Sequence, residues 1–292
     1  MIRRIFIYLH EMFPLPSLIA SFLSGSMVIL VLWKLEHREA NFVSVTLLGC
    51  LSLCLFSLLL RIMDEFKDYQ DDLKNFPQRP LPSGRVYKSD LKVLSGVILV
   101  GMLLLNLWDE MVLLSAFGVL FYSLGMLLWF GMEKKMRSSL PLALITHHPI
   151  VLIHFLYLFS VYEAGFDEVT LRSFVTVLPL ALIMTNWELS RKMKFEADEN
   201  NYTTYSKIWG RIPAGLLCLC LQLIILSASC LILWQLRTHW FIFASYLVAF
   251  VSTMIPYVRY LANKPIHKNL KSWSEAQILL VLVTINLCAW IS

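Results

Sequence analysis

Five acidic residues crowd into nine positions of this 292-residue chain, at the end of a long apolar run. They are Asp64, Glu65, Asp68, Asp71 and Asp72. In an α-helix, Asp64, Asp68 and Asp72 would share one face, because each step of four residues rotates by only about 40°. Asp71 lies near the same face and competes with Asp72 for the third place. The spacing therefore predicts a single stripe of three carboxylates.

Such a stripe is unfavourable without a compensating cation. Like charges four residues apart repel, and the C-terminal end of a helix already carries negative charge. Carboxylate oxygens are the ligands that Mg²⁺ prefers, and Mg²⁺ is commonly shared between carboxylates and substrate phosphates. Asp64, Asp68 and Asp72 are thus our candidate catalytic and metal-binding residues. The alternative is a solvated face of ion pairs, in which Arg61 and Lys67 neutralise part of the charge.

The segment after these acids is predicted to turn sharply. Pro77, Pro80, Pro82 and Gly84 exclude a regular helix between Lys74 and Gly84. A stiff turn of this kind should fold Arg79 back toward the aspartates. The planar guanidinium group matches the geometry of a diphosphate, so Arg79 is a candidate phosphate-binding residue.

The acids and the proline-rich turn together resemble the first aspartate-rich motif of the UbiA superfamily of intramembrane prenyltransferases. The matching residues run from Asp64 to Asp72 and from Asn75 to Gly84, although Asp64 stands where the family usually has Asn. The resemblance implies about nine transmembrane helices, a bound Mg²⁺ and an isoprenyl diphosphate substrate. It is specific only over residues 61–85.

A second group of charged residues follows the sixth apolar run, where the family has a second pair of aspartates. Glu188 can take the first place of that pair, but Lys192 stands four residues later. Glu188 and Glu196, together with Glu199, are candidates for a second metal site in another register. Alternatively, Arg191 and Lys192 contact the diphosphate directly and replace a metal with fixed charge. A surface helix with mixed charges is the third interpretation.

Two smaller groups leave their alternatives open. Lys134 and Lys135 are candidate diphosphate ligands by resemblance to a Tyr-x-x-x-Lys element of the family, in which Phe130 would replace the Tyr. A basic cluster at the membrane edge explains these lysines equally well. His147, His148 and His154 suggest either a proline-kinked helix whose His bonds a freed carbonyl or a polar, acceptor-binding cavity.

The elements that must position these residues are apolar. Hydrophobic residues make up 58% of the chain, charged residues only 15%, and the mean hydropathy is +0.67. Nine runs are long enough, or nearly so, to cross a bilayer. They cover residues 16–35, 42–63, 91–107, 111–131, 140–162, 170–188, 213–236, 240–261 and 275–291. We therefore predict an all-α polytopic membrane protein, with about nine transmembrane helices in one bundle around a central cavity and one domain over residues 1–292.

Loop charges predict the orientation. With a cytoplasmic N-terminus, 21 of the 25 Lys and Arg residues fall on the cytoplasmic side and 4 on the other side, as the positive-inside rule requires. Both candidate site loops are then cytoplasmic, and the basic residues do not suggest nucleic acid. We expect no cleavable signal peptide, and we expect the bilayer to be a bacterial plasma membrane.

Three functional hypotheses follow. The first is an Mg²⁺-dependent prenyltransferase that ionises an isoprenyl diphosphate and passes the prenyl group to an aromatic or other lipophilic acceptor. The second is a UbiA-type membrane terpene cyclase, which uses the same ionisation without an external acceptor. The third is a transporter or scaffold, which the position of the charges at the ends of the apolar runs disfavours.

Overall fold

The computed structural model describes residues 1–36, 42–163, 171–199 and 203–291, and all regular elements in these ranges are helices. The chain forms two compact units. The first contains Met1–Ser26, Ala40–Lys134 and Leu156–Asp167, and the second contains Met27–Glu39, Lys135–Phe155 and Glu168–Ser292. The helices α2 (Leu15–Glu36), α7 (Glu133–Ser138) and α9 (Pro149–Glu163) pass from one unit to the other.

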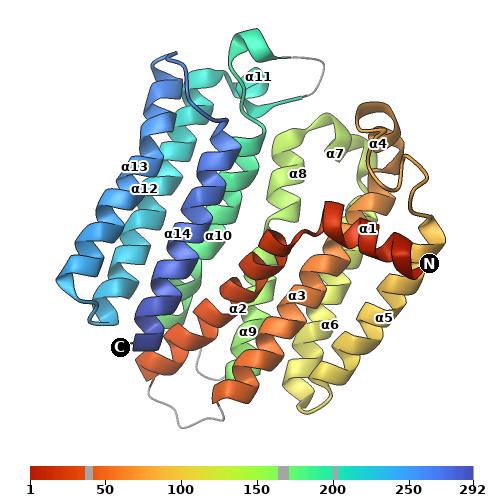
Figure 1. Cartoon of the computed structure of the whole chain (residues 1–292), viewed down its shortest axis with the longest axis horizontal. Helices are drawn as coiled ribbons and strands as arrows, with labels where there is room; N and C mark the ends of the chain where they lie inside the picture. Colours follow the sequence, from red (N-terminus) through yellow and green to blue (C-terminus); the bar gives the residue numbers. More distant parts are fainter. Residues whose placement is uncertain (37–41, 164–170, 200–202, 292) are drawn as a thin grey trace. The chain divides into compact units, whose positions relative to one another are not determined.

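The first unit is built on α3 (Phe42–Lys67), α5 (Lys88–Asn106) and α6 (Glu110–Leu127), which pack against one another (Figure 1). Asp109 begins α6 by accepting hydrogen bonds from the backbone N–H groups of Met111 and Val112. Within the unit, the Asn106 side chain accepts a 2.7 Å hydrogen bond from the Tyr157 hydroxyl. An amide in an apolar span needs such a partner, because lipid offers none.

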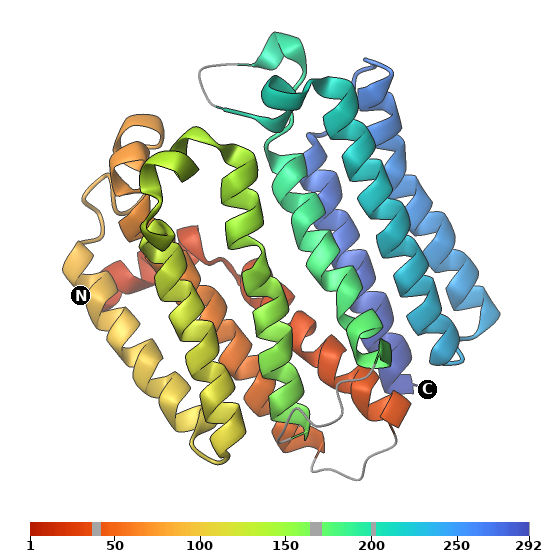
Figure 2. The ribbon, with the colours of Figure 1, turned by 180° about the vertical axis from the view of Figure 1, so that it is seen from behind.

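The second unit is built on four long helices that pack against one another, with two short helices beside them. It contains α8 (Leu140–His147), α10 (Leu171–Arg191), α11 (Tyr205–Trp209), α12 (Arg211–Gln235), α13 (Trp240–Leu261) and α14 (Leu270–Ile291). Here α10 packs against α12 and α14, and α13 packs against the same two helices (Figure 2). Buried polar side chains link them: Gln277 accepts from Asn186 at 3.2 Å and donates to Thr253 at 3.2 Å. Such interhelical bonds hold membrane helices together where hydrophobicity alone does not.

The all-helical membrane architecture predicted from the sequence is confirmed. Within the described residues, eight helices are long and apolar enough to cross a bilayer. These helices match eight of the nine predicted runs. The remaining run, the sixth in the chain (residues 170–188), corresponds to α10. The fifth run is divided into α8 and α9 at His148, because Pro149 cannot donate to the helix ladder. There the His147 ring bonds the carbonyl of Ala143 at 2.9 Å. The carbonyl that Pro149 deprives of its helical donor is that of Ile145, four residues before the proline, so a histidine bonded to a freed carbonyl stays a prediction.

The first helix, α1 (Ile2–Met12), lies outside the nine predicted runs. It is strongly amphipathic: the side chains of Ile2 and Phe6 are about two-thirds exposed, whereas Tyr8 is fully buried. Its polar side chains bind the first unit, where Arg4 pairs with Asp90 through two hydrogen bonds of 2.6 and 2.9 Å. An apolar face opposite such anchors is typical of a helix that lies in the membrane interface.

A left-handed turn follows α6. Phe130 lies in this turn and packs edge-on against Tyr122 of α6, with 5.1 Å between ring centroids. The ring also covers Gly125, where an added Cβ would come within 2.7 Å of the Phe130 ring. The turn therefore depends on the absence of a side chain at position 125.

Substitution of Gly125 tests this packing. Gly125→Ala should destabilise the protein by about 1–3 kcal/mol, because the Phe130 ring must move out of a packed position. Gly118→Ala in the same helix is the control, since nothing lies within 4 Å of its added Cβ. Thermal unfolding of the purified protein in detergent should show a lower melting temperature for Gly125→Ala alone. Equal melting temperatures for the two variants would contradict the assigned packing.

Candidate active site

The acidic segment spans two helices instead of the single helix predicted from its spacing. Helix α3 ends at Lys67, and Asp68 begins α4 (Tyr69–Asn75) with φ −98° and ψ 9°. Backbone hydrogen bonds of 2.9 Å still join Asp68 to Asp64 and Asp72 to Asp68. The break places Asp71 and Asp72 in the first turn of α4, where negative charge is favourable.

Burial divides the acids of this segment. Glu65 and Asp72, seven residues apart and so on one helical face, are 1% and 6% exposed. The Asp64 side chain is 46% exposed. Glu65 was not among the sequence candidates, although its spacing from Asp72 could have identified it. The structure therefore adds a second buried carboxylate to the predicted group.

Three acids of this segment, Asp64, Glu65 and Asp72, each form an ion pair with a basic side chain. Arg61 pairs with Glu65 one helical turn later, and the Lys67 ammonium lies 3.4 Å from Asp64. The proline-rich turn brings Arg79 back, and its Nη1 lies 2.7 Å from both carboxylate oxygens of Asp72. The Arg79 guanidinium also stacks on the Phe76 ring at 4.1 Å. This compensation by bases is the ion-pair arrangement that the sequence left open as an alternative.

Helix α1 closes one side of the acidic group. The Tyr8 hydroxyl and one Glu65 oxygen are buried and have no hydrogen-bond partner among the described residues. Burial and the nearby Glu65 carboxylate raise the pKa of Tyr8 above its ordinary value. At the end of α1, Glu11 pairs with Arg85 of the proline-rich turn, and this pairing lowers the pKa of Glu11. The helix thus braces both the acids and the turn that carries Arg79.

The second charged group lies at the end of α10. Both Glu188 oxygens are engaged, one by Arg191 and the other by Lys192 at 2.9 Å. The side chains of Glu188 and Lys192 are only 15% and 13% exposed. The described residues contain no group of three His, Cys, Asp or Glu side chains placed to hold a metal. Paired bases next to one acid fit the fixed-charge interpretation better than a second metal site.

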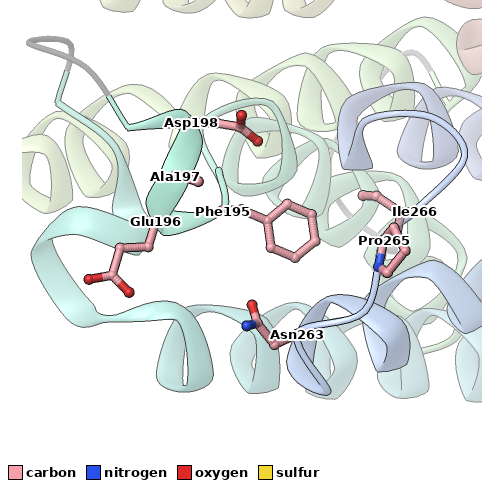
Figure 3. A pocket seen from close by; sticks show the side chains of 7 residues that line it. All are labelled: Phe195, Glu196, Ala197, Asp198, Asn263, Pro265 and Ile266. Atoms are coloured by element: carbon pink, nitrogen blue, oxygen red, sulfur yellow. The ribbon is translucent and has the colours of Figure 1, made fainter.

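Glu196 belongs to a different environment from Glu188. It begins the short helix η2 (Glu196–Asp198) and lines a hollow of about 780 Å³ (Figure 3). The other lining residues are Phe195, Ala197, Asp198, Asn263, Pro265 and Ile266. Figure 3 shows Glu196 and Asp198 pointing apart, on different sides of the Phe195 ring. Glu199 accepts hydrogen bonds from Thr204 and Ser206 instead.

The remaining candidates are less constrained. Lys134 and Lys135 are exposed on α7 and lie just after the left-handed turn at Trp129–Gly131. His148 shares a 3.2 Å hydrogen bond with Thr185 of α10, and His154 is buried in α9.

The candidate residues are divided between the two compact units. The aspartates and Arg79 belong to the first unit, whereas Glu188, Arg191, Lys192 and Glu196 belong to the second.

Comparison with known proteins identifies the fold. No family model and no curated protein sequence matches the chain. A solved structure of digeranylgeranylglyceryl phosphate synthase, a UbiA-family intramembrane prenyltransferase, is similar with a TM-score of 0.61 at 18% sequence identity. The match covers 99% of this chain and 100% of the other. The protein therefore has the helical membrane fold of that prenyltransferase, as its first motif predicted.

Proposed function

We propose that the protein is an Mg²⁺-dependent intramembrane prenyltransferase that ionises an isoprenyl diphosphate and transfers the prenyl group to a lipophilic acceptor. The observation that carries this proposal is the dense acidic segment, with Arg79 folded onto it, at the end of a membrane span. The shared fold with a membrane prenyltransferase supports the same reaction class.

In the first group, as in the second, the described residues hold no set of three acids placed around one ion, so the predicted three-carboxylate site is replaced by a proposal with fewer protein ligands. Mg²⁺ needs only one or two protein carboxylates, since waters and substrate phosphates complete its shell. Asp64 is half-exposed, and one buried Glu65 oxygen has no hydrogen-bond partner among the described residues. Asp64 and Asp68 are the proposed ligands, with Asp72 joining them if Arg79 moves to the diphosphate. When bound, the ion would neutralise charge on the leaving diphosphate.

The protein's own groups would do the remaining work. Arg79 would stabilise the negative charge that grows on the diphosphate as the carbon–oxygen bond breaks. Arg191 and Lys192 of the second group are the other candidate diphosphate ligands. Lys134 or Lys135 would add to this charge from the membrane surface. The apolar helices would keep water away from the allylic cation until the acceptor attacks. Glu188 would hold Arg191 and Lys192 in place and not bind a metal itself.

The proposal is tested with the purified chain in lipid nanodiscs. Isoprenyl diphosphates of several lengths are supplied with Mg²⁺, with and without phenolic and other lipophilic acceptors, and diphosphate and organic products are measured. Product formation that needs an acceptor supports prenyl transfer. Release of a hydrocarbon without any acceptor would instead support the terpene cyclase, which the altered second acidic motif keeps as the alternative. The absence of turnover with every substrate would refute both.

Lys192 distinguishes the two interpretations of the second group. If Lys192 binds diphosphate, Lys192→Gln should raise the KM for the isoprenyl diphosphate about 10-fold, because a charge-assisted contact is lost. If Glu188 binds a metal instead, Lys192→Gln should lower the Mg²⁺ concentration needed for half-maximal activity, because Glu188 loses a competing cation. The KM for the isoprenyl diphosphate should then stay unchanged. Lys271→Gln is the matched control, because Lys271 also pairs with a glutamate four residues away but is exposed.

A further inference from the structure

The side chain of Lys67 is largely buried at the acidic segment. Its side chain is only 7% exposed, although a lysine at the end of a membrane helix usually extends its charge into water. Its Nζ lies 3.4 Å from Asp64, the most accessible carboxylate of the three ion pairs. A buried cation is costly to maintain, so its position calls for an explanation beyond helix stability.

An aromatic ring holds this ammonium in place. Lys67 Nζ lies 4.6 Å from the centroid of Trp129, within cation–π distance. Trp129, Phe130 and Gly131 have φ values of 55°, 47° and 73°, so three consecutive residues are left-handed and two of them are aromatic. Strained backbone of this kind persists where its surroundings impose it, and it is concentrated at functional sites.

We propose that Lys67 is a further diphosphate-binding residue, which rests on Asp64 in the ligand-free protein and passes to the substrate. This inference deepens the proposed function and depends on it for the identity of the substrate. Asp64 cannot serve Lys67 and Mg²⁺ equally, because the two cations compete for one carboxylate. With Asp64 engaged by the ion, Trp129 would keep the Lys67 ammonium beside the acids, where a phosphate oxygen would replace the carboxylate as its partner.

The two charged groups both place basic side chains beside an acid. In the second group, two bases surround the single acid Glu188. In the first group, Lys67 adds a fixed cation of the same kind beside Asp64. Each group thus carries tethered positive charge of its own beside an acid. A purely structural Lys67 would neutralise Asp64 and have no effect on anion binding.

Binding measurements without turnover test the inference. The full chain in nanodiscs of zwitterionic lipid is titrated with inorganic pyrophosphate in the presence of Mn²⁺. Lys67→Gln should weaken pyrophosphate binding about 10-fold, and Lys67→Arg should retain most of it, because the charge-assisted contact survives. Trp129→Leu should weaken it about 3-fold through loss of the cation–π support. Lys74→Gln is the control, since Lys74 is exposed on α4 and should bind like the unmodified protein.

The expected effect of Lys67→Gln on the affinity for Mn²⁺ alone has the opposite sign. Without pyrophosphate, Lys67→Gln should bind Mn²⁺ more tightly in electron paramagnetic resonance titrations, because Asp64 has lost its competing cation. Thermal unfolding of each variant identifies any loss of the fold, and Lys67→Arg keeps the test valid if Lys67→Gln is unstable.

Four results would overturn the role of Lys67. They are unchanged pyrophosphate binding in Lys67→Gln, an equal loss in Lys74→Gln, weak binding in Lys67→Arg despite an intact fold, and no binding by the unmodified chain. Failure of the proposed function has a different signature. If pyrophosphate binds as expected but no isoprenyl diphosphate is turned over, prenyl transfer is refuted while the anion-binding role of Lys67 stands.

Discussion

Asp68→Asn should reduce diphosphate release from the isoprenyl substrate about 10³-fold, the effect expected when transition-state charge stabilisation is lost. Asp68 is the residue at which α3 gives way to α4, and its carbonyl accepts hydrogen bonds from the N–H groups of Asp71 and Asp72. Asn is as favourable as Asp at the start of a helix, so the fold should survive the change. The substitution therefore removes the charge and keeps a residue suited to begin α4.

The measurement is single-turnover release of diphosphate with saturating substrate and a series of Mg²⁺ concentrations. Asp109→Asn is the matched control, because Asp109 also begins a helix but lies at the start of α6, outside the acidic segment. Its activity should equal that of the unmodified protein. If Asp68→Asn retained full activity while the unmodified enzyme turned over substrate, Asp68 would have no role in metal binding.

Arg79→Met should lower the stability of the protein by about 2–3 kcal/mol, because it strands a buried carboxylate. The Asp72 side chain is 8% exposed, and Arg79 reaches both of its oxygens at 2.7 Å. Arg79 is itself 31% exposed, so the expected loss lies below that of a fully buried pair. The midpoint of thermal unfolding in detergent reports the change.

A second substitution separates the structural role of Arg79 from its proposed chemical role. In the double variant with Asp72→Asn, no buried charge is left without a partner, so most of the lost stability should return. Activity is compared with that of Asp72→Asn alone, which lacks the same carboxylate but keeps Arg79. The double variant should be less active than Asp72→Asn, because the guanidinium that would contact the diphosphate is missing. Equal activities of these two variants would show that Arg79 serves only to hold Asp72.

The sequence alone determined the class of the protein and most of its spans. Long apolar runs must be helical in a bilayer, since every backbone polar group needs a partner within the segment. The first acidic motif and its proline-rich turn are equally local, so they could be recognised from spacing, and Arg79 does reach Asp72. These features depend on neighbouring residues along the chain and need no knowledge of distant contacts.

Tertiary contacts decided which charged groups are buried and which are paired. The helix is interrupted at Asp68, whereas the spacing of the acids alone favoured one continuous helical stripe. Glu188 is held by Arg191 and Lys192, while Glu196 lies in another environment, although the sequence placed both in one candidate metal set. The buried Glu65 lies close enough to Tyr8 of α1 to raise its pKa, although α1 begins more than fifty residues earlier in the chain.

The left-handed turn shows the same division. No pattern of residue types in the sequence predicts the contact between Lys67 and the Trp129 ring. The turn that carries Trp129 depends on the packing of Phe130 against Gly125 and Tyr122. Hydrophobicity and charge spacing are properties of a segment, so the sequence shows them directly. The partner of each charge depends on which segments meet, and that is settled only when the helices pack.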